Sequence, residues 1–235
     1  MIPIAFLTSA FAGVFGMGGG VPLITLMPGL VPAAAIIPLH ALTQLASNGS
    51  RAWMSRSHID YSLVAPFLLG GVLGALFGGA LFNKLDLRWL PGLIGLVILV
   101  ITWLPLPLVR GAGRLPLVFL GFYQTGIGML IGASGPLGAA LLTQRNSKRD
   151  WLVANTAVYM SVNHALRAVA FVFMGFTLWP WLPLLGGMIV GATAGSWVGT
   201  RLRQFIPEGN FQFYFKLLIS ALALRLIIGV VVEHL

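Results

Sequence analysis

The sequence contains no cysteine and few charged residues. Charged side chains make up 8% of its 235 residues, and only five residues are acidic, whereas 58% are hydrophobic. Soluble domains carry about 25% charged residues, so this chain has too few charges to cover a surface that faces water. The lack of cysteine excludes disulfides and thiolate metal sites. The composition therefore predicts a membrane protein whose solvent is mostly lipid.

Two further absences narrow the class of function. Asp60, Asp86 and Asp150 fall in loops or at helix ends, where they can cap a helix, and no acidic residue lies deep in an apolar segment. This argues against a cation site made of carboxylates. The chain also lacks a GxxxxGK[ST] phosphate-binding loop, which excludes ATP-driven transport by this chain alone. We expect no cofactor and no bound metal ion.

The basic residues lie in small groups rather than in one patch. The formal net charge is +9, and groups such as "SKR" at 147–149 and "RLR" at 201–203 lie between apolar segments. This pattern is typical of the cytoplasmic loops of membrane proteins, in which Lys and Arg are enriched. We therefore expect the lipid bilayer as a partner and no nucleic acid.

Apolar segments of helical length account for most of the chain. Six of them meet or approach the ~20 residues that a helix needs to cross the hydrocarbon of a bilayer. They are 32–53, 62–82, 89–107, 151–175, 181–200 and 212–233. Two more segments are interrupted: 2–28 by "GMGGGVP" at 16–22, and 116–143 by "GASGP" at 132–136. We predict an all-α polytopic membrane protein.

Each interrupted segment opens one half of a duplicated chain. Three features recur in the same order, namely a proline after the break, an Asn/Arg pair and a glycine triplet. The matches are Pro22 with Pro136, Asn48 with Asn163, Arg51 with Arg167, and Gly70, Gly74 and Gly78 with Gly187, Gly191 and Gly195. We predict a first transmembrane repeat over 1–108, a connecting loop over 109–114 and a second repeat over 115–235. Each repeat has one broken or re-entrant helix plus three transmembrane helices.

The distribution of basic residues favours an inverted arrangement of these halves. If each interrupted segment crosses the membrane once, the basic residues of the loops divide seven against four. If each is instead a re-entrant pair of half-helices, nine lie on one side and only Lys84 and Arg88 on the other. The positive-inside rule prefers the second arrangement. Three full spans per half then make the halves inverted repeats.

The interruptions are suited to ending one half-helix and starting another near mid-membrane. Proline fits the first turn of a helix, so the second half-helices are expected to start near Val21–Pro22 and Gly135–Pro136, with Ser134 as an N-cap. A helix N-terminus exposes unpaired backbone donors and the positive end of the helix dipole, which attract an anion. The alternative is that the glycines only allow close helix crossing and the prolines only kink the chain.

Polar side chains inside the following spans complete the predicted site. Arg167 lies within an apolar segment, where charge is costly and usually functional, and Asn163 shares its helix face one turn earlier. Snorkelling to the interface is the alternative for Arg167 and the favoured account of Arg51. His40 and His164 can be structural or can carry a proton. The predicted substrate-binding residues are Gly18, Gly19, Gly20, Pro22, Gln44, Asn48, Arg51, Gly132, Ser134, Gly135, Asn163 and Arg167.

The order of these motifs carries a family resemblance. "GMGGGVP" is followed by an Asn/Ser-containing second helix and a Gly-rich third, and "GIGMLIGASGP" at 126–136 is a weaker echo. Over nearly its whole length the chain thereby resembles the TauE/SafE family of bacterial membrane transporters. The resemblance implies a multi-pass secondary carrier in the bacterial inner membrane for a small anion such as sulfite or an organosulfonate. A coupling proton or sodium ion, and assembly as a homodimer, are compatible with it.

Two other classes of protein fit parts of the pattern. "GASG" at 132–135 also matches the GxSG nucleophile motif of rhomboid-type intramembrane serine proteases, which need a histidine to take the serine proton. His164 lies on the very next span, which is not the rhomboid arrangement. The other class is a structural membrane subunit without transport, for which paired helix breaks would have little use. We therefore predict a transporter and not an enzyme.

Overall fold

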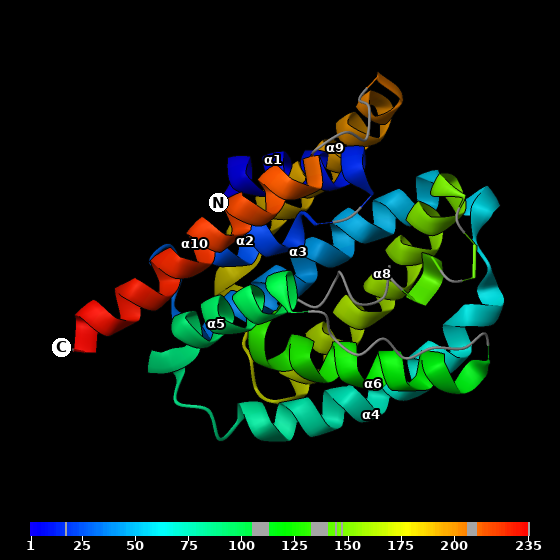
Figure 1. Cartoon of the computed structure of the whole chain (residues 1–235). Helices are drawn as coiled ribbons and strands as arrows, with labels where there is room; N and C mark the ends of the chain where they lie inside the picture. Colours follow the sequence, from blue (N-terminus) through cyan, green and yellow to red (C-terminus); the bar gives the residue numbers. More distant parts are fainter. Residues whose placement is uncertain are drawn as a thin grey trace.

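Helices make up the fold (Figure 1). The structure is a computed structural model that describes residues 1–16, 18–104, 113–132, 141–143, 145–146, 148–205 and 211–234. Within these ranges the chain forms no β-strand, and one isolated bridge joins Pro28 to Val31. The helices are α1 (Ile2–Phe15), α2 (Gly20–Leu26), α3 (Ala33–Met54), α4 (Val64–Phe82), α5 (Leu90–Trp103), α6 (Arg114–Ile131), α8 (Arg149–Phe173), α9 (Leu182–Leu202) and α10 (Phe211–His234). The predicted all-α fold is confirmed.

The predicted spans coincide with these helices, but two of them are too polar to face lipid. Among the described residues, three helical segments are long and apolar enough to cross a membrane, judged by length and composition: Tyr61–Phe82, Arg114–Ile131 and Trp179–Phe205. α3 and α8 are not among them because both carry polar and charged side chains, including Arg51 and Arg167, and these side chains are buried. Other helices therefore shield α3 and α8 from the lipid.

α3 and α8 pack against each other at the centre of the bundle and run in opposite directions. The His40 and His164 rings meet with their centroids 5.7 Å apart. Further along, the Asn155 side chain bonds to the backbone of His58 and Asp60, just past the end of α3. Since contacts move forward along α3 while they move backward along α8, the two helices are antiparallel.

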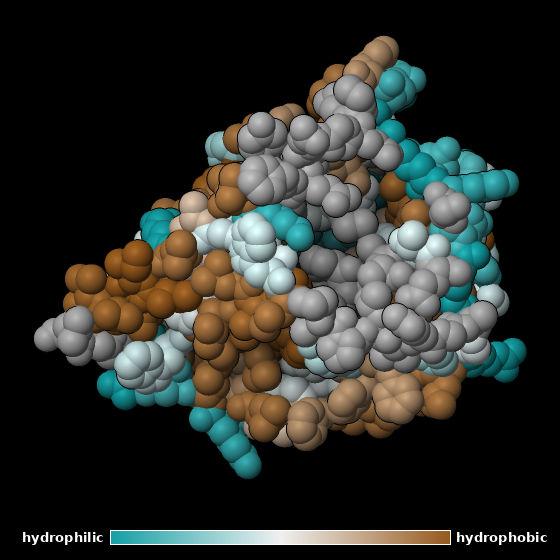
Figure 2. Space-filling model, viewed as in Figure 1, coloured by the Kyte–Doolittle hydropathy of each residue, from teal (hydrophilic) through white to brown (hydrophobic). Residues whose placement is uncertain are grey.

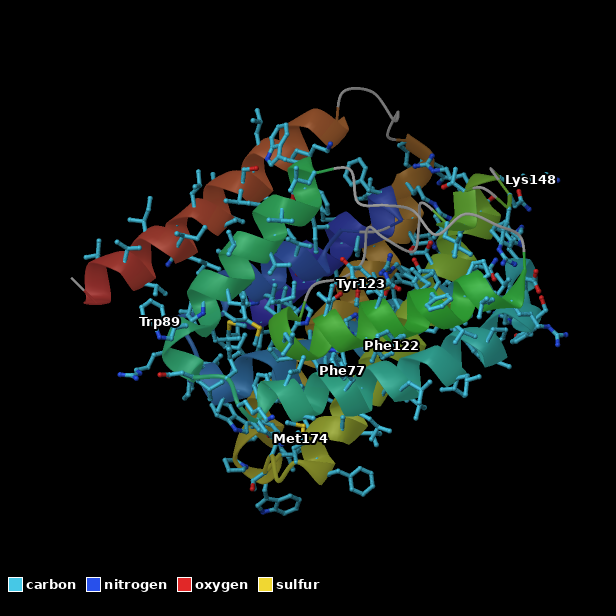
Figure 3. All side chains as sticks on the ribbon, turned by 60° about the horizontal axis from the view of Figure 1, so that its bottom comes forward. Phe77, Trp89, Phe122, Tyr123, Lys148 and Met174 are labelled. Carbon is cyan, nitrogen blue, oxygen red and sulfur yellow. The ribbon has the colours of Figure 1, made fainter. Side chains whose placement is uncertain are left out.

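Two outer helix pairs cross closely through glycine. α4 packs on α6 and α1 packs on α9. A Cβ at Gly74 would overlap the backbone carbonyl of Phe122, and a Cβ at Gly195 would overlap that of Phe6. Next to the first crossing, the Phe77 and Phe122 rings lie 5.8 Å apart (Figure 3). The glycine triplets thus act as small-residue packing surfaces, as in other membrane helices.

The outer surface is apolar, as lipid contact requires. Brown, hydrophobic surface extends over α10 and along the edge formed by α4 and α6, while teal, hydrophilic surface gathers towards the ends of the molecule (Figure 2). Exposed tryptophans lie at helix ends. Trp89 lies just before α5 (Figure 3), and Trp103 is the last residue of α5. Tryptophan at such positions is typical of the membrane–water interface.

The first interrupted segment forms a hairpin. α1 ends at Phe15 and is capped by Gly16, whose φ of 83° is left-handed, and α2 starts at Gly20 with Pro22 in its first turn. Gly19 already lies against the carbonyl of Thr8 in α1, so the chain has turned back alongside the helix that it just left. The predicted helix start near Val21–Pro22 is therefore correct to within two residues. In the second interrupted segment, Ser134, Gly135 and Pro136 lie outside the described residues.

Candidate functional site

α1 and α6 each end on an arginine from a central helix, Arg51 of α3 for α1 and Arg167 of α8 for α6. Arg51 Nη1 donates to the Gly16 carbonyl oxygen at 2.7 Å, and Arg167 Nη1 donates to the Gly132 carbonyl oxygen at 3.0 Å. Both glycines are left-handed caps, with φ of 83° and 74°. A cation at the last carbonyls of a helix offsets the negative end of the helix dipole. The two arginines that the sequence paired thus make the same contact.

Arg51 has all three of its guanidinium nitrogens hydrogen-bonded. Nε donates to the Ser47 carbonyl at 3.4 Å, Nη1 donates to the Ala12 carbonyl at 3.1 Å as well as to Gly16, and Nη2 donates to Asn48 Oδ1 at 2.5 Å. Asn48 Nδ2 in turn donates to the Gln44 carbonyl at 2.8 Å. Because Arg51 is only 3% exposed, it does not snorkel. Its contacts are those of a residue that holds α1 and α3 together.

Arg167 is fully buried but only partly bonded. Nη1 donates to the Gly132 carbonyl and to His164 Nδ1, the latter at 3.1 Å. Nε and Nη2 have no hydrogen-bond partner within the part of the chain that the structure describes. Gly128 makes room for this side chain, because a Cβ there would lie 3.1 Å from Arg167 Cδ. The described residues therefore leave two donor nitrogens of this buried cation without a partner.

α3 brings two more polar side chains to the same region. His40 Nε2 donates to the Gly20 carbonyl at 2.9 Å, which leaves Nδ1 as an acceptor with no partner in the described ranges. Gln44 Nε2 likewise lacks a partner there. A Cβ on Gly20 would lie 3.3 Å from both Gln44 Oε1 and His40 Nε2, so glycine lets α2 approach closely. We call Arg167, His164, His40 and Gln44 the central polar cluster.

Asn163 faces α6 rather than the central polar cluster. Its Nδ2 donates to Thr125 Oγ1 at 3.3 Å, the interhelical bond that was the alternative to ligand binding. Its Oδ1 has no hydrogen-bond partner among the described residues. Thr125 was not among the predicted substrate-binding residues. The sequence marks it only as a polar residue within an apolar span. Asn163 therefore combines a structural bond with one open acceptor.

The first glycine run is accounted for mainly by turn geometry and packing. Gly16 and Gly18 have positive φ, and a Cβ at Gly19 would overlap the Thr8 carbonyl. The carbonyls of Gly18 and Gly19 accept bonds from Val21 and Leu23 within the turn, and the Pro22 ring is buried. Of the four predicted residues in this run, only Gly20 contacts the central polar cluster. Backbone donation to a ligand here stays a prediction.

The ion pairs of the described residues lie outside the central polar cluster. In the described ranges, ion pairs join Arg88 to Asp86 and Arg203 to Asp150, both near helix ends, and no carboxylate contacts Arg167. The same ranges contain no group of three potential metal ligands. The only charge in the cluster is therefore the Arg167 guanidinium, which favours an anion.

A helical bundle with an apolar exterior and a buried basic cluster defines a polytopic membrane protein. The chain matches the sulfite exporter TauE/SafE family over residues 1–226 and belongs to that family. Because the family consists of membrane transporters, the protein is a transporter and not an enzyme, and the protease interpretation of "GASG" is set aside. No curated protein and no solved structure shows significant similarity to the chain.

Proposed function

We propose that the protein is a secondary transporter of a small oxyanion, either sulfite, an organosulfonate or a close relative, and that the anion binds at the central polar cluster. The observation that carries this proposal is the fully buried Arg167 guanidinium, whose Nε and Nη2 have no partner in the described chain. The name of the family, sulfite exporter, supports the class of substrate.

The chemistry of the open atoms fits a tetrahedral oxyanion. Nε and Nη2 lie on one edge of the planar guanidinium, so two oxygens of one anion can accept from them side by side. Such charge-assisted bonds contribute about 1.5–3 kcal/mol each. Gln44 Nε2 adds a neutral donor, and His40 Nδ1 adds an acceptor for an anion that carries a hydroxyl, such as hydrogen sulfite. Ser134 and Gly135 stay candidates on the second break.

We propose that the two halves are inverted repeats in a bacterial inner membrane. Three packing relations support this: α3 runs antiparallel to its counterpart α8, α5 packs on its counterpart α10, and α1 packs on α9 as α6 packs on α4. In this arrangement the hairpin of α1 and α2 enters the membrane from the outer side and returns to that same side. Single cysteines at Ser57 and Asn83 test this, because only Asn83 should react with an impermeant thiol reagent applied to whole cells. The reverse labelling would contradict this orientation of the halves.

Binding measurements on purified variants test the site. Titration of the detergent-solubilised protein with sulfite and with methanesulfonate should show binding of at least one of them. Arg167→Gln, which removes the charge, should weaken that binding by at least about tenfold, the equivalent of 1.4 kcal/mol. Arg167→Lys keeps the charge without the planar fork and should retain part of the affinity. Arg225→Gln is the control, since Arg225 is exposed on α10. Unchanged affinity in folded Arg167→Gln would remove Arg167 from the site.

A further inference from the structure

One face of α8 carries four buried polar residues in line. Thr156, Tyr159, Asn163 and Arg167 follow one another at intervals of three or four residues, which places them on one side of a helix. None of them is more than 5% exposed. At 1.5 Å per residue the line extends over about 16 Å, roughly half the thickness of the hydrocarbon. We call these four residues the α8 polar face.

The α8 polar face contains more open polar atoms than a packed interior tolerates. Asn163 Oδ1 and two nitrogens of Arg167 have no hydrogen-bond partner in the described ranges. The Tyr159 hydroxyl lies beside the side chains of Thr156 and Gln124. A buried polar group left unpaired costs about 1–3 kcal/mol, and buried polar groups are nearly always paired. A row of such atoms therefore indicates contact with water or a polar ligand.

The equivalent residues of α3 are His40, Thr43, Ser47 and Arg51, and among their side-chain polar atoms only His40 Nδ1 lacks a hydrogen-bond partner in the described ranges. Thr43 Oγ1 donates to the Leu39 carbonyl at 2.8 Å, and the Ser47 hydroxyl pairs with that of Ser196 in α9 at 2.9 Å. All three guanidinium nitrogens of Arg51 are also bonded. In α8, by contrast, Asn163 Oδ1 and Arg167 Nε and Nη2 lack a partner in the described ranges, although Asn163 Nδ2 and Arg167 Nη1 are bonded.

The Thr156 end of the line lies near the surface. α8 starts beside a pocket of about 820 Å³ whose lining includes His58, Asp60 and Lys148. Asn155, the neighbour of Thr156, donates to the His58 carbonyl at 3.0 Å and accepts from the Asp60 amide at 2.8 Å. Lys148 marks this end of α8 in Figure 3, and Met174 marks the opposite end. The line thus runs from the pocket end of α8 towards Arg167.

We infer that the α8 polar face is the wall of a hydrated path along which the oxyanion moves between the pocket end of α8 and Arg167. The inference rests on the proposed function. Hydroxyl groups and the Arg167 guanidinium can replace part of the hydration shell of an anion, and the α8 polar face itself carries no carboxylate, although Asp60 and Asp150 line the pocket at its outer end. The face also explains why the open polar atoms are concentrated in the second half of the chain.

Single cysteines test the path directly, because the natural chain contains none. Thr156→Cys and Asn163→Cys lie on the α8 polar face, whereas Ala154→Cys and Ala157→Cys lie on other faces of the same helix at 0% exposure. A small charged methanethiosulfonate should modify the first pair at least about tenfold faster than the second, since the reaction needs access to the thiolate. Sulfate or methanesulfonate should slow the reaction of the first pair only.

The outcomes separate the path from the proposed function. Equal and slow modification of all four cysteines would overturn the path, even if oxyanion binding is measured. Fast modification without protection by either anion would overturn the assignment of the path to the anion. If neither anion binds to the unmodified protein in a titration, the proposed function fails, and the assignment to an anion fails with it.

A measurement on the unmodified chain guards against misfolded variants. Met160 lies on α8 beside the α8 polar face, and Gln124 Nε2 approaches its sulfur at 3.9 Å. Hydroxyl radicals generated in the surrounding water should oxidise Tyr159 and Met160 faster than Met188, which is 0% exposed on α9. Protection of Tyr159 and Met160 to the level of Met188 would contradict a hydrated path.

Discussion

Replacing Arg51 by alanine should destabilise the hairpin of α1 and α2 without weakening anion binding. Arg51 Nη1 donates to the Gly16 carbonyl at 2.7 Å and to the Ala12 carbonyl at 3.1 Å, and both bonds tie α3 to α1. Hydrogen bonds from a charged group contribute about 1.5–3 kcal/mol each, so the loss of both costs about 3–6 kcal/mol. For a chain of this size, the corresponding decrease in Tm is about 6–24 °C.

Thermal unfolding in detergent and hydrogen exchange of α1 peptides measure the effect. Arg167→Ala is the matched comparison, since Arg167 bonds to a single backbone carbonyl, that of Gly132. It should lower Tm less than Arg51→Ala does and lower anion affinity more. A wild-type Tm together with unchanged exchange of α1 in Arg51→Ala would refute the structural role of Arg51. Loss of anion affinity in the folded Arg51→Ala protein would refute its exclusion from the site.

Three further substitutions test the packing and the cluster. Gly74→Val should abolish the yield of monodisperse protein because its Cβ would overlap the backbone of α6, whereas Gly229→Ala, with nothing within 4 Å of the new Cβ, should not. Gly128→Ala should weaken anion binding in a titration with little change in Tm, because its Cβ would lie 3.1 Å from Arg167 Cδ. Gln44→Met keeps the volume but removes the open amide donor, so the titration should show about a five- to tenfold loss of affinity, near 1 kcal/mol; equal affinity would exclude Gln44.

The sequence located the helices well because apolar length and helix-breaking residues are local signals. The first break shows this, since the cap of α1, Gly16, and the start of α2, Gly20, both lie within the predicted run. The role of that run was less accessible. A glycine that admits a ligand and one that admits a neighbouring backbone look identical in sequence, and Gly19 faces the Thr8 carbonyl of α1. Only the tertiary contact distinguishes the two.

The register of the predicted duplication also required the structure. Matching by residue type pairs Asn48 with Asn163, but the hydrogen bonds support a match one position further along. Arg51 bonds to Asn48 and Arg167 bonds to His164, each three residues earlier on its helix. This register pairs the amide of Asn48 with the imidazole of His164. An alignment based on chemical similarity would not choose that pair. Position on the helix relative to the arginine is the quantity that both halves share.

The difference between Asn48 and His164 gives a physical reason why Arg167 keeps nitrogens without a partner in the described chain and Arg51 does not. In the first half, Asn48 Oδ1 accepts from Arg51 Nη2. In the second half, His164 accepts through Nδ1 from Arg167 Nη1, the nitrogen already bonded to Gly132, and Nη2 keeps no partner in the described chain. His164→Asn should therefore let the amide oxygen reach Nη2 and close Arg167 as Arg51 is closed. We expect weaker anion binding in a titration together with an unchanged or higher Tm. Unchanged affinity in the folded variant would show that His164 does not control the availability of Arg167.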